Sequence, residues 1–410
     1  MRSKERVIMI LLIVLIVFLC GFIVFSLKPF ISINLEYNSN NSTNKVSASE
    51  SSTTSKANKD VAPANKVVQN QIPVVPITHI ATPKVVKAVY LTNWVAGSPK
   101  LATPIFNLVK KTELNSVVVD IKDSTGRIGF TIPGKEIAEL GSIQKRVRDI
   151  KSLIYNLHKD GIYVIGRIST FQDPYLTKIR PGWALKKASD GAVWENSKSL
   201  AFLDPTNPSV ENYILNIALG AYSIGFDEIN FDYIRYPSDG DIKNIDYNLK
   251  PGETRADNIE KFFEFIHTNM KKNKDIPISV DLFGMTTEVN DDMGIGQVWG
   301  KAMPYFDYIC PMLYPSHYST GHLGFANPAE HPYEIISNSL SKAIKKSKAI
   351  NQNVNKIRPW LQDFDLGAVY DKSMVNTEIK AVYDADLASW TLWSPENKYD
   401  NGVLKLENNN

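Results

Sequence analysis

Cysteine is almost absent from this chain, which has two cysteines among 410 residues. Cys20 lies in an apolar N-terminal run and Cys310 lies far away in a predicted strand, so no internal disulfide is expected. Stability must then come from packing. The hydrophobic content of 43% is ordinary for a protein with a large core.

A surplus of charge of one sign is missing as well. The formal net charge is +3, which is close to balance for this length. A dedicated nucleic-acid-binding protein would normally carry a basic stripe, so nucleic acid is not an expected partner. No feature of the sequence predicts an obligate protein partner either.

Signatures of cofactors and metals are also missing. The segment from Trp94 to Lys100, which follows the first predicted strand, fits neither the dinucleotide-binding pattern nor the P-loop pattern. His317 and His322 follow a later predicted strand, but their spacing matches no usual zinc pattern and no third ligand is evident. The sequence therefore predicts no cofactor and no metal.

The start of the chain holds a long apolar run. Residues 7–27 contain no charge and follow Arg2, Lys4 and Arg6. The run is long enough to cross a bilayer as a helix, and the preceding positive charges favour a cytoplasmic N-terminus. Residues 1–28 are therefore predicted to form a single-pass anchor in the cell membrane, with the rest of the chain outside. A cleaved signal peptide, which would give a secreted protein, is the alternative, although no clear small-x-small cleavage motif follows.

The next segment, residues 29–84, is rich in Ser, Thr, Asn, Lys and Ala and then in Pro. Such a composition buries too little apolar surface to offset the entropy lost on ordering, so the segment is predicted to be a disordered, flexible linker. The last residues, 397–410, are predicted to form a C-terminal tail.

Between linker and tail, short apolar segments alternate with segments that carry an apolar helical face. Strands are predicted at 86–94, 116–123, 163–169, 228–236, 278–284, 308–315, 357–364 and 387–394. Apolar helical faces occur, for example, within 147–157, 210–221 and 259–270. Eight such strands predict a (β/α)₈ TIM barrel over residues 85–396. A doubly wound open sheet is the alternative, and the missing glycine-rich loop makes it the weaker one.

The segment from Ile224 to Ser238 indicates where a reaction site would lie. Its strand ends in Asp232, Arg235 and Tyr236 before Pro237 breaks it. In barrels of alternating strands and helices, reaction sites form at the C-terminal ends of the strands. Taking alternate residues of each strand as inward-facing adds candidates from the other strand ends.

These strand-end residues suit glycoside hydrolysis, which needs a pair of carboxylates. The candidate catalytic residues are Asp232, Asp281 and Asp120. Aromatic rings would offer flat surfaces to sugar C–H groups, and amides and charged groups would bind hydroxyls. The candidate substrate-binding residues are Arg235, Tyr236, Asn230, Lys122, Arg167, Tyr314, Trp360, Gln362 and Trp393.

Roles follow from these residue types. Asp232 would be the nucleophile or base, and Asp281, or after it Asp120, would be the acid. Burial beside Phe283 would raise the pKa of Asp281 so that it keeps its proton at neutral pH. Arg235 would either hold Asp232 ionised or bind an anionic or hydroxyl group of the sugar. The alternative function is a tethered polysaccharide-binding module without catalysis; in both cases the partner is a cell-wall or extracellular glycan.

Four motifs carry a family resemblance. The segments 226–237, 295–297, 310–318 and 358–364 resemble the bacterial putative glycosyl hydrolase domain family, over about residues 85–395. The resemblance implies a TIM barrel with glycosidase-like architecture.

A more distant similarity is to the family 18 chitinases. Asp227, Asn230 and Asp232 fall on three aspartate positions of the chitinases' fourth strand, and Met312 to Tyr314 looks like their Met-x-Tyr. Ile234 stands where those enzymes place the glutamate acid. The similarity therefore does not imply their mechanism.

Overall fold

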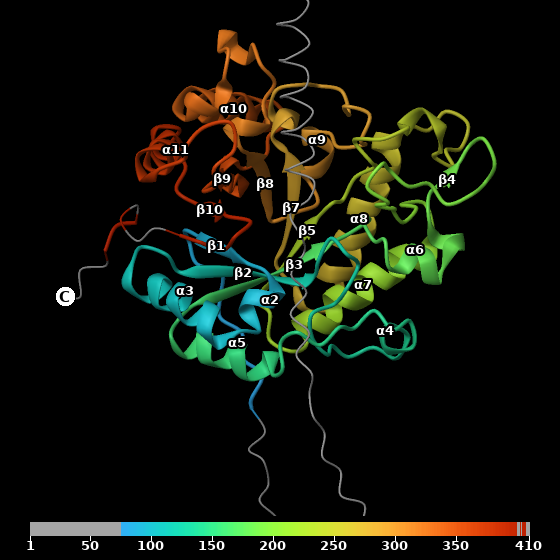
Figure 1. The fold of residues 1–410 in the computed structure, drawn as a ribbon, viewed down its shortest axis with the longest axis horizontal. Helices are drawn as coiled ribbons and strands as arrows, with labels where there is room; N and C mark the ends of the chain where they lie inside the picture. The colour runs from blue at the N-terminus through green and yellow to red at the C-terminus, as the bar shows by residue number, and fades with distance from the viewer. Residues whose placement is uncertain (1–74, 400–401, 403, 407–410) are drawn as a thin grey trace, which may run out of the picture. The chain divides into compact units, whose positions relative to one another are not determined.

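The computed structural model describes residues 75–399, 402 and 404–406, and within them eight parallel strands close into a barrel (Figure 1). Around the ring the order is β1, β2, β3, β5, β7, β8, β9 and β10. Their bounds are Lys87–Leu91, Ser116–Lys122, Tyr163–Ser169, Glu228–Asp232, Ile278–Phe283, Tyr308–Leu313, Trp360–Gln362 and Trp390–Trp393. Each predicted strand corresponds to one of these, so the predicted (β/α)₈ barrel is confirmed.

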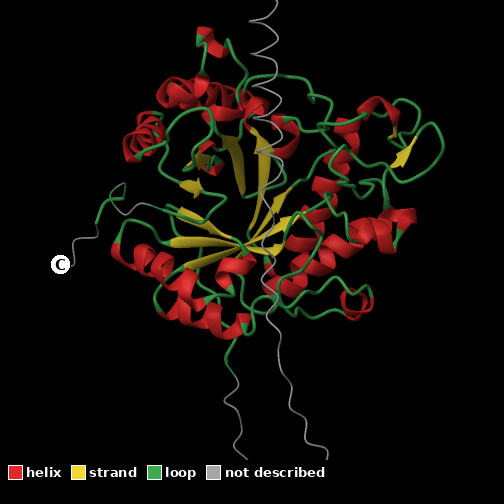
Figure 2. Ribbon diagram, in the orientation of Figure 1, coloured by secondary structure: helices red, strands yellow, loops and turns green. Residues whose placement is uncertain are grey.

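Helices surround the strands (Figure 2). The α-helices are α2 (Asn93–Ala96), α3 (Pro99–Lys111), α4 (Lys135–Glu139), α5 (Ile150–Lys159), α6 (Leu176–Ile179), α7 (Pro208–Tyr222), α8 (Arg255–Lys274), α9 (Trp299–Ala302), α10 (Pro332–Ala349) and α11 (Lys372–Asp384). Local sequence sets their ends: Thr254 and Asp257 form a capping box at the start of α8. Ile259, Phe262 and Phe263 of α8 are fully buried against the barrel.

Shorter elements decorate the loops. A two-stranded antiparallel sheet, β4 (Lys186–Lys187) with β6 (Ile245–Asp246), lies outside the barrel. The 3₁₀ turns are η1 (Pro181–Trp183), η2 (Ile242–Asn244), η3 (Gly284–Thr287), η4 (Pro315–His317), η5 (His322–Gly324), η6 (Pro328–Glu330) and η7 (Val354–Lys356). Of these, η3 and η4 directly follow β7 and β8 and so lie at the mouth of the barrel.

Several strands are shorter than predicted. The strand predicted at 228–236 ends at Asp232, because Tyr233 adopts a left-handed conformation with φ of 49°. The strand predicted at 86–94 ends at Leu91, because Thr92 caps α2 by accepting from the Val95 amide. In both places the apolar sequence continues past the point where the ladder stops.

Residues 75–84, here called the N-terminal strap, pack on the barrel although the sequence assigns them to the linker. The Ile80 amide donates to Asp227 Oδ1 at 2.8 Å, and Thr78 Oγ1 lies 2.7 Å from His158 Nδ1. The His79 ring stacks on Tyr222 with centroids 4.2 Å apart. Polar side chains that look like linker in the sequence thus find partners at the N-terminal end of the barrel.

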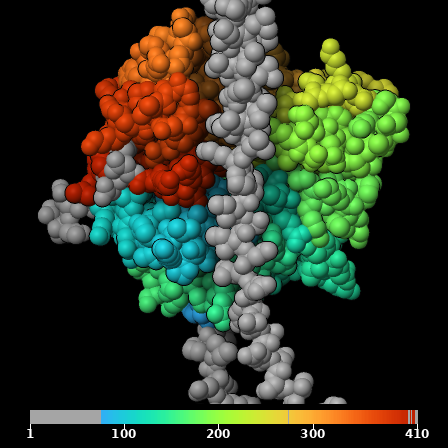
Figure 3. All heavy atoms as spheres, in the orientation of Figure 1, coloured from blue at the N-terminus to red at the C-terminus, as the bar shows by residue number. Residues whose placement is uncertain are grey.

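The two ends of the described chain meet at the seam of the barrel. β1 pairs in parallel with β10, and the space-filling view shows the C-terminal segments against the N-terminal barrel segments (Figure 3). Beyond β10, the Asn397 side chain accepts from the Thr92 amide at 2.9 Å and the Tyr399 hydroxyl donates to the Tyr90 carbonyl at 2.7 Å. The start of the predicted tail therefore braces β1.

The predicted anchor at 1–28 and the linker up to residue 74 lie outside the described residues. Within 75–399, 402 and 404–406, the structure contains no helix that is both long enough and apolar enough to span a bilayer. Cys310, predicted in an apolar strand, lies on β8 and is buried as a free thiol.

Candidate active site

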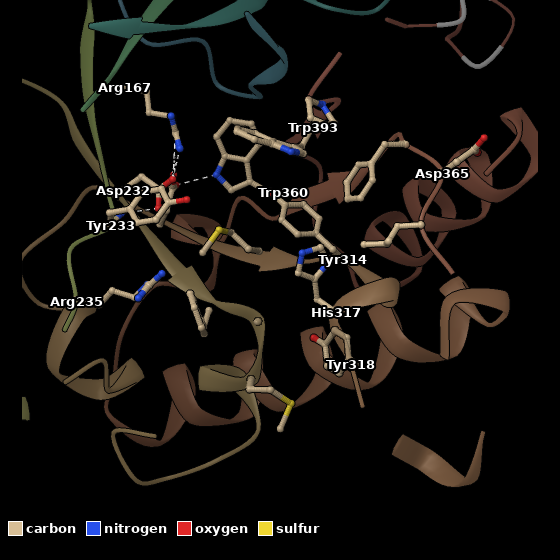
Figure 4. Close-up of a pocket in the computed structure, with 18 residues that line it drawn as sticks. Arg167, Asp232, Tyr233, Arg235, Tyr314, His317, Tyr318, Trp360, Asp365 and Trp393 are labelled. Atoms are coloured by element: carbon tan, nitrogen blue, oxygen red, sulfur yellow. Dashed lines mark hydrogen bonds and ion pairs between the residues drawn. The ribbon is translucent and has the colours of Figure 1, made fainter. Parts of the chain in front are cut away.

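A cavity of about 620 Å³ opens at the C-terminal ends of the strands. Its walls come from the ends of β3, β5, β7, β8, β9 and β10 and from the loops that follow them. Figure 4 shows Arg167, Asp232 and Arg235 on one side of this cavity and the rings of Trp360, Tyr314 and His317 on the other. The mouth of the barrel thus has a charged wall and an aromatic wall.

Arg167 of β3 organises the charged wall. Its Nη1 donates to Asp120 Oδ1 at 2.6 Å, and its Nε and Nη2 both donate to Asp232 Oδ2, the Nε bond at 3.1 Å. The same Nε lies 4.0 Å from Asp281 Oδ2. Tyr90 donates its hydroxyl hydrogen to the other oxygen of Asp120 at 2.6 Å. One guanidinium therefore joins carboxylates from three different strands.

Asp281 of β7 has a different environment from Asp232. Its Oδ1 accepts from Asn230 Nδ2 at 2.8 Å and from Trp360 Nε1 at 2.7 Å, and the residue is 1% exposed. Burial, reinforced by the negative charge of Asp232, raises the pKa of Asp281 to about 8, although Arg167 acts in the opposite direction. Asp281 is thus a protonated carboxylic acid at neutral pH, and its Oδ2 accepts neither of these two hydrogen bonds.

Asp232 ends β5 at the rim of the same cavity. Its Oδ1 accepts from the amide of Tyr233 at 2.6 Å, while Oδ2 faces Arg167. The left-handed Tyr233 turns the chain there, and both side chains line the cavity. A strained backbone conformation at a strand end is common at functional sites.

Aromatic rings form the opposite wall. Tyr90 and Trp393 stack with centroids 4.1 Å apart, and Trp360 meets Trp393 edge-on at 5.6 Å. Tyr314 lies edge-on to Phe364 at 5.9 Å. These faces offer the flat apolar surface that a sugar ring covers.

The short motif Ile295-Gly296-Gln297 holds the end of β7. Gln297 Oε1 accepts from the Phe283 amide at 2.9 Å, and its Nε2 donates to the Asp281 carbonyl at 3.2 Å. Gly296 has φ of 82°, and a Cβ there would lie 2.5 Å from Ile259, so glycine is required. The motif acts on the site by fixing the backbone on either side of Leu282.

Seven of the twelve residues predicted for the site line the cavity: Asp232, Asp281, Arg167, Arg235, Tyr314, Trp360 and Trp393. Asp120 and Asn230 lie behind this layer and contact it through Arg167 and Asp281. Burial raises the pKa of Asp120, against the opposing effects of Arg167 and the Tyr90 hydroxyl.

The other three predicted residues lie elsewhere. The ladder shifts register between Asp120 and Lys122, so Lys122 turns to Asp173, where Nζ and Oδ2 are 2.9 Å apart in a fully buried ion pair. Tyr236 is fully buried, edge-on to Tyr247 at 5.1 Å. Gln362 accepts from Ser316 Oγ at 2.8 Å and so fixes the loop after β8. Simple alternation along a strand could predict none of these three positions.

Several lining residues escaped the sequence reasoning. They are Tyr233, Gly284, Met285, Tyr318, Asp365, Leu366 and Pro395, which all lie in turns beyond the strand ends. Their only signal was membership of, or closeness to, the motifs at 226–237, 310–318 and 358–364. His317 also lines the cavity, whereas His322 lies 3.2 Å from Glu288.

The fold and the site define a (β/α)₈-barrel protein with a carboxylate and aromatic mouth. The chain belongs to the family described as "Putative glycosyl hydrolase domain", whose model matches residues 88–399. The predicted family membership is thereby confirmed.

Solved structures agree in fold. The glycoside hydrolase domain of PgaB (BpsB) from Bordetella bronchiseptica is 12% identical with a TM-score of 0.57, covering 79% of this chain and all 100% of that one. A hypothetical protein from Ruminiclostridium thermocellum ATCC 27405 is 32% identical with a TM-score of 0.43, covering 47% of this chain and 96% of that one. The spore cortex-lytic enzyme SleL of Bacillus megaterium QM B1551 is 10% identical with a TM-score of 0.46, covering 81% and 74%. No curated protein matches the chain.

Proposed function

We propose that this protein is a glycoside hydrolase that acts on a cell-wall or extracellular polysaccharide. The observation that carries the proposal is the contrast between Asp232 and Asp281, two carboxyl groups on one cavity. Asp232 is paired with a guanidinium, whereas Asp281 is buried among neutral donors that favour its protonated form less than burial does. Two titratable groups with opposed environments are the arrangement that acid–base catalysis needs.

Each carboxyl group then has a role. Asp281 gives its proton to the glycosidic oxygen, and the bond from that oxygen to the anomeric carbon breaks with its electron pair on the leaving oxygen. Asp232 either attacks the anomeric carbon or takes a proton from the attacking water. Arg167 holds Asp232 in place and balances its charge. The aromatic wall orients the sugar.

We further propose that the barrel is tethered outside the cell membrane. The support is the uncharged run at residues 7–27 after Arg2, Lys4 and Arg6, followed by a long polar segment. Such a tether would keep the barrel within reach of the polymers of the envelope.

The test uses the 410-residue chain with a panel of cell-wall and extracellular polysaccharides and detects released oligosaccharides by mass spectrometry. Asp281→Asn and Asp232→Asn should each lower turnover by about 10²- to 10⁴-fold, as expected for loss of an acid or base. Asp160→Asn, at an exposed helix end far from the mouth, is the matched control. Full turnover by either site variant would contradict the assigned roles.

A sugar-binding barrel without catalysis is the second candidate. The observation that favours it is that Arg167 already engages Asp232 and Asp120, as a purely structural ion cluster would. This candidate predicts binding of polysaccharide by the wild type and by Asp281→Asn alike, with no products from either.

A further inference from the structure

Arg235 is a buried cation on the cavity wall without a carboxylate of its own. It follows β5 and is 8% exposed. Its one hydrogen bond among the described residues runs from Nη1 to the Tyr236 carbonyl at 2.9 Å. A guanidinium has five N–H donors, so most of its hydrogen-bonding capacity is unused.

The neighbours of Arg235 are mainly aromatic. Its guanidinium carbon lies 4.6 Å from the ring centre of Phe283, 5.2 Å from Tyr233 and 5.9 Å from Phe202. Within the described part of the chain, no carboxylate oxygen comes within 4.0 Å of its nitrogens, and Asp232 and Asp239 act on it only from farther away. Burial lowers the pKa of Arg235, so its surroundings disfavour the charge. A buried charge without a partner costs free energy that a binding partner can offset.

The contrast with Arg167 narrows what Arg235 does. Arg167 engages two carboxylates directly, and Asp232 is one of them. Of the two roles that the sequence left open for Arg235, holding Asp232 ionised therefore belongs to Arg167. What is left for Arg235 is to receive a group of the substrate.

We propose that Arg235 binds a carboxylate of the substrate, and that the substrate is therefore an acidic polysaccharide built with uronic acid residues. This inference rests on the proposed function, because it concerns the same cavity. The planar fork of a guanidinium matches a planar carboxylate through two parallel hydrogen bonds. Among the described residues no lysine lines the cavity, so the additional cations that a phosphate-rich polymer would favour are missing. With Asp281 protonated, two guanidinium groups face the carboxylates of Asp120 and Asp232, which leaves the mouth open to one more negative charge.

The experiment measures binding separately from turnover. The 410-residue chain carrying Asp281→Asn is titrated with polygalacturonate, alginate and hyaluronan, and with the carboxyl-reduced form of each. At least one acidic polymer should bind ten-fold or more tightly than its reduced form. Arg235→Met in the same background should abolish that preference, and Arg235→Lys should keep part of it. Arg127→Met is the matched control, because Arg127 stacks on Tyr175 away from the cavity.

Thermal melting provides the second measurement. Methionine replaces a buried, unpaired cation by an apolar chain of similar length, so Arg235→Met should melt no lower than the wild type. Equal binding of acidic and reduced polymers, no binding of any acidic polymer, or a preference that survives Arg235→Met would overturn the proposal. Acidic binding without products in the wild type would contradict the hydrolase but not this inference. Products from neutral glycans alone would do the reverse.

Discussion

At the scale of single residues, the site depends on what surrounds each carboxyl group. Asp281 and Asp232 are both nearly buried, at 1% and 5% exposure. Asp232 faces a guanidinium, whereas Asp281 faces an amide and an indole. The same residue type is therefore suited to two roles, and the surroundings select them.

This difference predicts the pH dependence. Because the pKa of Asp281 is raised to about 8, the acid is protonated below that pH and loses its proton above it, so kcat/KM should fall on the alkaline side near that value. Asn230→Leu removes a hydrogen bond that lowers this pKa, and the alkaline limb should move to higher pH. The measurement is a pH–rate profile of both proteins. An alkaline limb that stays in place in the variant would show that it does not report Asp281.

At the scale of elements, the N-terminal strap is held by one carboxylate. Asp227 at the start of β5 accepts from the Ile80 amide, from the Val164 amide at 2.9 Å and from His158 Nε2 at 2.9 Å. Burial would raise the pKa of Asp227, but the hydrogen bonds from His158, His79 and Val164 outweigh it and lower the pKa overall. A residue on a chitinase aspartate position thus serves here to fasten the strap, far from the mouth.

Asp227→Asn should loosen the strap. The variant places amide hydrogens against N–H donors, so the free energy of unfolding should fall by about 1–3 kcal/mol. Because the folded pKa is lowered, this contribution is present above the unfolded value of about 4 and is lost as pH falls through the folded pKa. Urea unfolding at neutral and acid pH measures it, and hydrogen exchange of the Ile80 amide reports the strap itself. Exchange that is equally slow in the variant would contradict this account.

At the scale of the whole molecule, the barrel interior holds a second charged layer below the site. Arg358 of the segment before β9 donates both Nη groups to Glu228 of β5. Ser279 Oγ also donates to Glu228, at 2.5 Å. All three residues are at most 1% exposed. Glu228 is thus part of the scaffold, as its position at the far end of the strand from Asp232 suggested.

Breaking this ion pair should destabilise the barrel strongly. Arg358→Met leaves a buried carboxylate without its partner and should cost about 3–5 kcal/mol. The double variant Glu228→Leu/Arg358→Met removes both charges and should recover much of that loss. Urea unfolding of the wild type, both single variants and the double variant forms the cycle. A double variant less stable than either single one would refute the reasoning.

The sequence predicted some parts of the site and not others, for physical reasons. Asp232 and Asp281 could be found because alternation along a strand is a local property. Lys122 was misplaced because a register shift in the ladder redirects it. Tyr233 was missed because its left-handed turn breaks the alternation. Errors thus cluster where backbone geometry departs from the regular strand.

The sequence by itself determined that eight strands alternate with helices and that their ends carry carboxylates, arginines and aromatic rings. Periodicity and residue type are local, and packing of an apolar strand between helices leaves little choice of architecture. Only the tertiary structure decided that Arg167, rather than Arg235, pairs with Asp232, and that the strap fastens to Asp227. Those contacts join residues up to 147 positions apart, and the free energy of a buried charge depends on neighbours that chain order does not reveal.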